Sequence, residues 1–151
     1  MRRGAGHFTG PPAITPGRII AAMQGLHLTA DLRGCAAGRA EMTDTASLRR
    51  ACLGAVERAG LTAVGDLFHR FEPAAAAPSP AAAPSGITGV VLLAESHVAV
   101  HTWPELEAAT LDVYVCNLGA DNSARAEALM DSLVAAFAPA RAERHARRRG
   151  E

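Results

Sequence analysis

The sequence contains no lysine, because every one of its 15 basic residues is an arginine. A chain without lysine cannot hold pyridoxal phosphate through a lysine Schiff base, which excludes that cofactor. The 15 basic residues are balanced by 15 acidic residues, so net charge gives no indication of a nucleic-acid partner. Aromatic residues make up only 4% of the chain, and the core must therefore be built mainly from valine, leucine and isoleucine.

Cysteine is also scarce, and its three positions, Cys35, Cys52 and Cys116, are widely spaced. The absence of a CxxC pair argues against a zinc ribbon, and the odd number argues against a secreted disulfide scaffold. No apolar run approaches the ~18 residues of a membrane span. Prolines interrupt the N-terminal stretch where a signal peptide would need an apolar segment. We therefore expect a reduced, cytoplasmic protein with no membrane partner.

Three segments of unusual composition divide the 151 residues. Residues 1–24 are rich in glycine and proline and predict a loose N-terminal extension. Residues 74–85 contain almost only alanine, proline and serine, which predicts a flexible loop. Residues 140–151 form a basic tail that we expect to be a solvated, frayed end. What remains, residues 25–139, predicts one domain.

Within that domain, runs of alternating or β-branched residues predict strands, and apolar residues at helical spacing predict two helices. The expected strands are 25–34, 61–72, 86–95, 97–103 and 110–116, and the expected helices are about 43–60 and 122–137. Thr43 or Thr45 is the expected N-cap of the first helix, and Gly60 its expected end. Short connections favour antiparallel pairing. Since two helices can cover only one face of the sheet, the sequence predicts an α+β two-layer sandwich that dimerises.

Most candidate catalytic side chains lie in the segment AESHVAVHTWPELEAATLDVYVC. It contains Ser96 and two histidines, His97 and His101. A strand would place the two histidine side chains on one face. A serine with a nearby histidine can form a nucleophile and its base, although two polar residues at the rim of a strand explain the same pattern. A zinc site that combines the histidines with Cys35 and Cys116 is disfavoured, because the four-residue histidine spacing suits a helix.

The motifs ESH, HTWPE and LDVYVC, with GLHLTADLRGC, FHRFEP and GITGVV, resemble those of the prokaryotic S-adenosylmethionine decarboxylases. The resemblance extends from residue 25 to about 137, apart from the alanine- and proline-rich loop. It implies the α+β fold of that family and self-cleavage between Glu95 and Ser96. Ser96 would become a pyruvoyl group that forms a Schiff base with the substrate, without a metal. The implied product is decarboxylated S-adenosylmethionine, an aminopropyl donor for spermidine and other polyamines.

The same resemblance implies roles for individual side chains in processing and catalysis. His101 is the expected processing base, and Thr88 provides a hydroxyl at a position that the family usually fills with serine. Cys116 is the expected proton donor during decarboxylation.

Three further positions match residues that bind the substrate in the family. Phe71 is expected to stack on the adenine ring, and Glu105 to accept hydrogen bonds from both ribose hydroxyls. Val98 matches another nucleoside contact. In the family the active site lies between two chains, which implies a homodimer.

The sequence also departs from the family pattern near the expected substrate site. Leu106, Glu107 and Ala108 replace an aromatic residue, glycine and tyrosine, and Asn117 replaces a glycine. A carboxylate at Glu107 could pair with an ammonium or guanidinium group. Two alternatives therefore stay open: a pyruvoyl-dependent decarboxylase of ornithine or arginine, and an unprocessed, non-catalytic relative that binds a partner.

Overall fold

The fold is a single antiparallel sheet with helices on one side, seen in a computed structural model that describes residues 24–72, 85–117 and 119–150. The strand order is β2-β3-β4-β5-β1-β6. The strands are β1 Gly25–Arg33, β2 Ala63–Arg70, β3 Ile87–Leu93, β4 Ser96–Trp103, β5 Ala108–Cys116 and β6 Arg141–Arg149. The helices are α2 Ala40–Thr43, α3 Thr45–Arg58 and α4 Ser123–Phe137, with a 3-10 turn, η1, at Pro104–Leu106. The expected extension and alanine-rich loop lie almost entirely outside the described residues.

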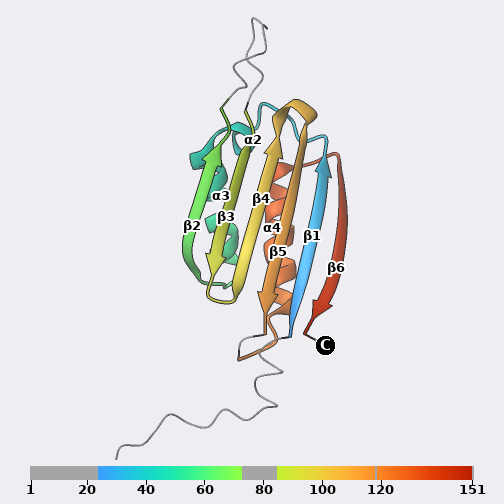
Figure 1. Cartoon of the computed structure of the whole chain (residues 1–151). Coiled ribbons are helices and arrows are strands. Elements are labelled where there is room, and N and C mark those ends of the chain that lie inside the picture. The colour runs from blue at the N-terminus through green and yellow to red at the C-terminus, as the bar shows by residue number, and fades with distance from the viewer. Residues whose placement is uncertain (1–23, 73–84, 118, 151) are drawn as a thin grey trace, which may run out of the picture.

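The two long helices pack against the same face of the sheet and leave the other face open (Figure 1). The core between the layers is formed by aliphatic side chains of the sheet and one face of each helix, including Leu48 and Val56 of α3 and Leu129, Leu133 and Phe137 of α4. The predicted two-layer α+β sandwich is therefore confirmed. None of the helices in the described part of the chain is long and apolar enough to cross a membrane.

The ends of α3 follow from local hydrogen bonding. The helix begins after Asp44, whose carboxylate accepts the backbone N–H of Ser47 at 2.8 Å. Hydrogen bonding to Ser47, most through its side chain and next through this backbone N–H, lowers the pKa of Asp44. The prediction of Thr43 or Thr45 as the cap was wrong, because the aspartate between them takes that position. Gly60, at φ 70°, follows the helix in the left-handed conformation expected of it.

The basic tail that was expected to fray instead forms β6, and that prediction was wrong for residues 141–149. The strand pairs with β1 along its whole length, from Arg141 opposite Arg33 to Arg149 opposite Gly25. All nine residues are exposed, so neither face contributes to the core. Apolar periodicity cannot reveal such a strand. Its charges also protect the sheet edge from pairing with another chain.

The register gives the sheet two chemically different ends. At the end drawn lowest in Figure 1, Ser96 lies opposite Val115, and Cys116 lies opposite Gly25. We call this the Ser96 end. At the upper end, the backbone N–H of Phe71 donates to the carbonyl of Gly86 at the start of β3. We call this the Phe71 end.

Candidate active site

The carbonyl oxygen of Glu95, the residue before β4, is held by two donors from one residue at the end of β5. The backbone N–H of Cys116 donates to it at 3.0 Å, and the thiol of Cys116 donates to it at 2.7 Å. Two fixed donors on one carbonyl oxygen can stabilise a negative charge that develops there. The peptide bond that follows this carbonyl leads to Ser96, so a hydroxyl nucleophile is one residue away.

The side chain of Glu95 is held as well. Its carboxylate accepts the backbone N–H of Thr62 at 3.3 Å, and the carbonyl of Thr62 accepts the N–H of Ala94 at 2.9 Å. The turn between β3 and β4 is therefore attached to the segment before β2. The Glu95–Ser96 bond thus has a defined position at both its carbonyl and its side chain, a constraint that no sequence motif indicates.

Only one of the three cysteines is accessible. Cys35 and Cys52 are completely buried, whereas Cys116 is partly exposed. Burial raises the pKa of the Cys52 thiol to about 12 and also raises the pKa of the Cys35 thiol, despite the nearby Arg39. Both buried thiols therefore stay protonated and inert at neutral pH.

Two asparagines hold the backbone around Cys116 through hydrogen bonds. The side-chain amide of Asn122 donates to the Cys116 carbonyl at 3.0 Å. The side-chain oxygen of Asn117 accepts the N–H of Asn122 at 3.0 Å, and the N–H of Asn117 donates to the carbonyl of Gln24 at 2.7 Å. Asn117, which the sequence marked as a departure near the substrate site, has a structural role here.

The other candidate residues lie toward the Phe71 end. Thr88 Oγ1 and His101 Nδ1 form a hydrogen bond of 2.9 Å across β3 and β4. His101 and Glu105 are exposed, and Phe71 is 50% exposed. All of these groups can be reached from solvent on the described chain.

The structure does not bring the two groups of candidates together within one chain. Ser96 and His101 lie on the same strand and are five residues apart, which at the usual rise corresponds to about 17 Å. Phe71 and Glu105 lie still further along the sheet, beside Gly86 and after Trp103. The pairing of Ser96 with His101 as its base is therefore not made within the described single chain.

Val98 differs from the other predicted contacts because its side chain is 1% exposed and belongs to the core. In the described single chain, its side chain therefore does not reach the open face.

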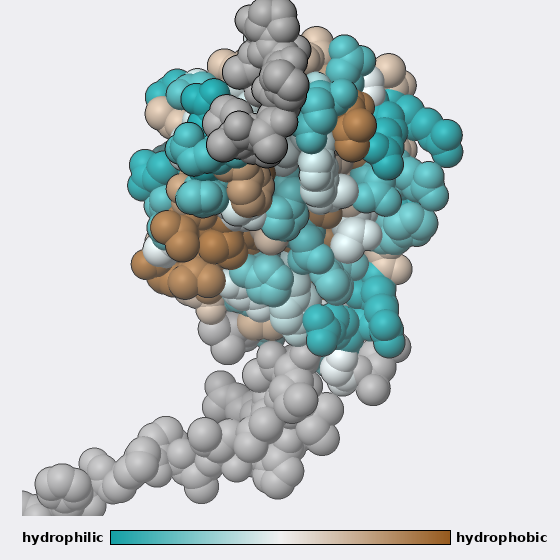
Figure 2. Space-filling model, turned by 45° about the horizontal axis from the view of Figure 1, so that its top comes forward, coloured by the Kyte–Doolittle hydropathy of each residue, from teal (hydrophilic) through white to brown (hydrophobic). Residues whose placement is uncertain are grey.

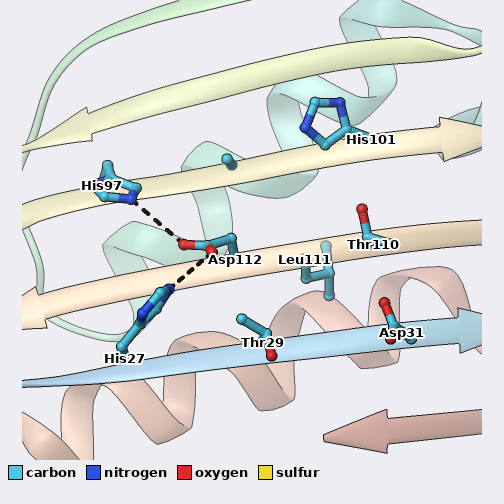
Figure 3. Close-up of a pocket in the computed structure, with 9 residues that line it drawn as sticks. His27, Thr29, Asp31, His97, His101, Thr110, Leu111 and Asp112 are labelled. Carbon is cyan, nitrogen blue, oxygen red and sulfur yellow. Dashed lines mark hydrogen bonds and ion pairs between the residues drawn. The ribbon is translucent and has the colours of Figure 1, made fainter. Parts of the chain in front are cut away.

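A polar groove of about 440 Å³ runs over the open face between the two ends (Figure 3). In it, the Asp112 carboxylate lies between His27 Nε2 at 2.8 Å and His97 Nε2 at 3.5 Å. The Tyr114 ring packs near both histidines, and the Arg149 guanidinium lies 5.0 Å from the ring centroid. No spacing in the sequence indicates this cluster, because its members come from four strands that only the register brings together.

The same open face is apolar on its β2 side. Leu67 and Leu92 are 70% and 51% exposed there, and Figure 2 shows apolar side chains gathered on that side of the molecule. A face with a polar groove and exposed leucines has the mixed character of a protein–protein interface.

The described residues do not offer a metal centre. Within 24–72, 85–117 and 119–150, no three His, Cys, Asp or Glu side chains gather in a way that could hold an ion.

Comparison with known proteins identifies the family. The family model described as S-adenosylmethionine decarboxylase matches residues 26–150. The chain belongs to the S-adenosylmethionine decarboxylase family. The match includes β6, so the strand is part of the decarboxylase domain and that domain does not stop at residue 139.

Individual relatives agree with this assignment. The S-adenosylmethionine decarboxylase proenzyme of Aquifex aeolicus is 36% identical over 126 residues, which cover 83% of this chain and 81% of the relative. The proenzyme of a Synechococcus strain is 39% identical over 94 residues, covering 62% of this chain and 63% of the relative. The crystal structure of the Aquifex aeolicus adenosylmethionine decarboxylase has a TM-score of 0.70 and 35% identity, and the match covers 85% of this chain and 92% of that one.

Glu107 gives a test of local strain beside the candidate site. It follows η1 at φ 47°, a left-handed conformation that favours glycine. Glu107→Gly should raise the free energy of unfolding by about 1 kcal/mol, because it removes the Cβ that crowds the backbone there. Glu107→Ala removes the carboxylate but keeps the Cβ, and it should stay within about 0.5 kcal/mol of the natural chain. Urea unfolding measures both; a less stable glycine variant would show that the turn is not strained.

Proposed function

We propose that this protein is a proenzyme that cleaves itself between Glu95 and Ser96 and then decarboxylates S-adenosylmethionine. The observation that carries the proposal is the double hydrogen bond from Cys116 to the Glu95 carbonyl. Membership of the family supports the activity. The product would serve as an aminopropyl donor for polyamine synthesis, in the cytoplasm.

Residues of this protein, taken from two copies of the chain, can perform the cleavage. The Ser96 hydroxyl attacks the Glu95 carbonyl carbon, and the two Cys116 donors stabilise the oxyanion while the acyl group moves from nitrogen to oxygen. His101 then removes the Cα proton of Ser96, and the Glu95 carboxylate leaves with the former serine oxygen. Water replaces the nitrogen of the resulting dehydroalanine, so ammonia is released and a ketone remains at residue 96.

The residues present fit a pyruvoyl group, because a serine follows a carbonyl that is already held by two donors. Once formed, the group supplies an electrophilic ketone that acts as an electron sink for loss of CO2. Cys116 holds a proton at Sγ that can be delivered to the carbon from which CO2 departs. Phe71 can stack on the adenine ring, and Glu105 can accept hydrogen bonds from the ribose.

The separation of about 17 Å along β4 supports an active site built from two chains. In a dimer with two-fold symmetry, the Ser96 end of one chain can lie beside the Phe71 end of the other. Ser96 and Cys116 would then meet Thr88, His101, Phe71 and Glu105 of the second chain. The uncovered sheet face, with its groove and its exposed Leu67 and Leu92, is the surface that such a partner would cover.

The alternatives from the sequence receive no support. The matched relatives are named as decarboxylases of S-adenosylmethionine, and nothing favours an ornithine or arginine decarboxylase or a non-catalytic binding protein.

Substrate choice can be tested by release of labelled CO2. We expect release from carboxyl-labelled S-adenosylmethionine and none from ornithine or arginine. Glu105→Gln should lower kcat/KM for S-adenosylmethionine by about 10- to 100-fold, because hydrogen bonds to a carboxylate are worth about 1.5–3 kcal/mol. Glu107→Gln, two residues away, is the matched control and should change it less than about twofold. Turnover of a basic amino acid that depends on Glu107 would overturn the substrate assignment.

The shared site can be tested by complementation of cleavage. His101→Ala and Ser96→Ala chains should each remain uncut when purified alone. In a mixed dimer, Ser96 of the first variant meets the intact His101 of the second, so the His101→Ala chain should be cut. Mass spectrometry identifies the products, because the 96–151 fragment carries the His101→Ala mass change. No more than half of all sites can react.

Subunit exchange must be shown independently by native mass spectrometry of the mixture. Uncut chains in a mixture that demonstrably contains mixed dimers would refute the two-chain site. Cleavage of the His101→Ala protein by itself would remove His101 as the processing base.

A further inference from the structure

Self-cleavage changes the charge beside Cys116. Before cleavage, the thiol donates at 2.7 Å to a neutral peptide carbonyl of Glu95. After cleavage, that same oxygen belongs to the α-carboxylate at the new end of the upstream segment. One unit of negative charge has therefore been created at hydrogen-bond distance from the thiol, if the chain end stays in place.

The structure contains attachments that would keep this chain end in place. The Glu95 side chain accepts the Thr62 N–H at 3.3 Å, and Ala94 donates to the Thr62 carbonyl at 2.9 Å. The Cys116 N–H holds the carbonyl oxygen itself at 3.0 Å. Cleavage breaks only the C–N bond between Glu95 and Ser96, so the donor and acceptor atoms of all three hydrogen bonds are retained. The N–H of Cys116 would bind a carboxylate more strongly than a neutral carbonyl.

The other ionisable groups near Cys116 are the same before and after cleavage. On its side of the sheet, β5 presents Tyr114, β4 presents His97 and β6 presents Arg149, while β1 presents His27 and, directly opposite Cys116, Gly25 without a side chain. The Glu95 side chain adds a carboxylate that is present in both states. In the proposed two-chain site, the second chain adds its His101 and Glu105, which are present both before and after cleavage. Asn117, the next residue, and Asn122, which donates to the Cys116 carbonyl, are neutral. The new carboxylate is therefore the one change of charge that cleavage makes among these neighbours, because the ketone formed at residue 96 is neutral.

We propose that the α-carboxylate created at Glu95 stays against Cys116 and keeps its thiol protonated, so that cleavage itself prepares the proton donor. The inference rests on the proposed function. A negative charge next to a thiol opposes formation of the thiolate. This matters chemically, because a thiolate is a nucleophile, and a sulfonium substrate bound beside it could alkylate it. Glu95 is then a positioning residue, whose side chain keeps the new chain end near Sγ.

The test measures how fast iodoacetamide alkylates Cys116 as a function of pH. Cys35 and Cys52 are fully buried, so they serve as unlabelled internal references in the peptide mass analysis. Ser96→Ala keeps the neutral carbonyl because it cannot cleave. The pH at which Cys116 reaches half its maximal rate should lie at least about one unit higher in the cleaved natural protein, as expected for a unit charge within about 4 Å at partial burial.

Two controls separate the carboxylate from other effects of cleavage. Treating the cleaved protein with borohydride reduces the ketone to an alcohol and leaves the Glu95 carboxylate, so the alkylation profile should keep its shift. Glu95→Gln retains an oxygen for the Thr62 N–H and should also keep it. Cleaved Glu95→Ala loses that attachment, and its profile should move back toward that of Ser96→Ala.

The outcomes are distinguishable from failure of the proposed function. A natural protein that shows only the uncut mass refutes self-cleavage itself. A cleaved protein whose alkylation profile coincides with that of Ser96→Ala refutes the inference and leaves the decarboxylase assignment standing. If Glu95→Ala does not cleave, the inference is still tested by two comparisons. The alkylation profile of the natural protein, untreated and borohydride-treated, is compared with that of Ser96→Ala.

Discussion

The two hydrogen bonds from Cys116 to the Glu95 carbonyl depend on the register between β4 and β5. Cys116 ends β5 and Glu95 precedes β4, and the antiparallel pairing of these two strands brings them to the same end of the sheet. A shift of one residue would turn every β4 side chain to the opposite face and remove the thiol from the carbonyl. The burial of Val98, Val100 and Thr102 against the helices fixes that register. The helix-covered core therefore positions the chemistry at the sheet's end.

The length of the strands imposes a second constraint. An eight-residue β4 separates the proposed cleavage point from His101 and the nucleoside-binding candidates. In the proposed function, one chain therefore carries two incomplete halves of a site. The open face between them is polar along β1, β4 and β5 and apolar along β2 and β3. A second chain, related by two-fold symmetry, would complete both halves at once. The same sheet would thus serve as scaffold, interface and source of catalytic groups.

The sequence predicted the layers of this fold well, because its core elements alternate or repeat with clear periods. The helix expected at 122–137 corresponds to α4, and the strands ending in LDVYVC and HTW are β5 and β4. The sequence did not predict β6, because its nine exposed residues have no apolar face. It also predicted a threonine as the N-cap of α3, where the structure has Asp44. These are features that depend on pairing and local geometry rather than on composition.

The site was predictable only in part, for the same reason. The motifs identified Ser96, Cys116, His101 and Glu105 as candidates, and a serine with a nearby histidine suggested a nucleophile and its base. The described chain does not bring Ser96 and His101 together. The contacts of Thr62 with Glu95 and of Asp112 with two histidines join distant segments, and no spacing in the sequence indicates them.

The most direct test is the rate at which freshly folded chains split into residues 1–95 and 96–151, followed by intact mass. The account predicts that Cys116→Ala, which keeps the backbone donor but loses the thiol donor, is cut about 100-fold more slowly than the natural chain. Cys116→Ser retains a hydroxyl donor and should be cut much faster than the alanine variant. Equal rates for the natural chain and Cys116→Ala would contradict the account.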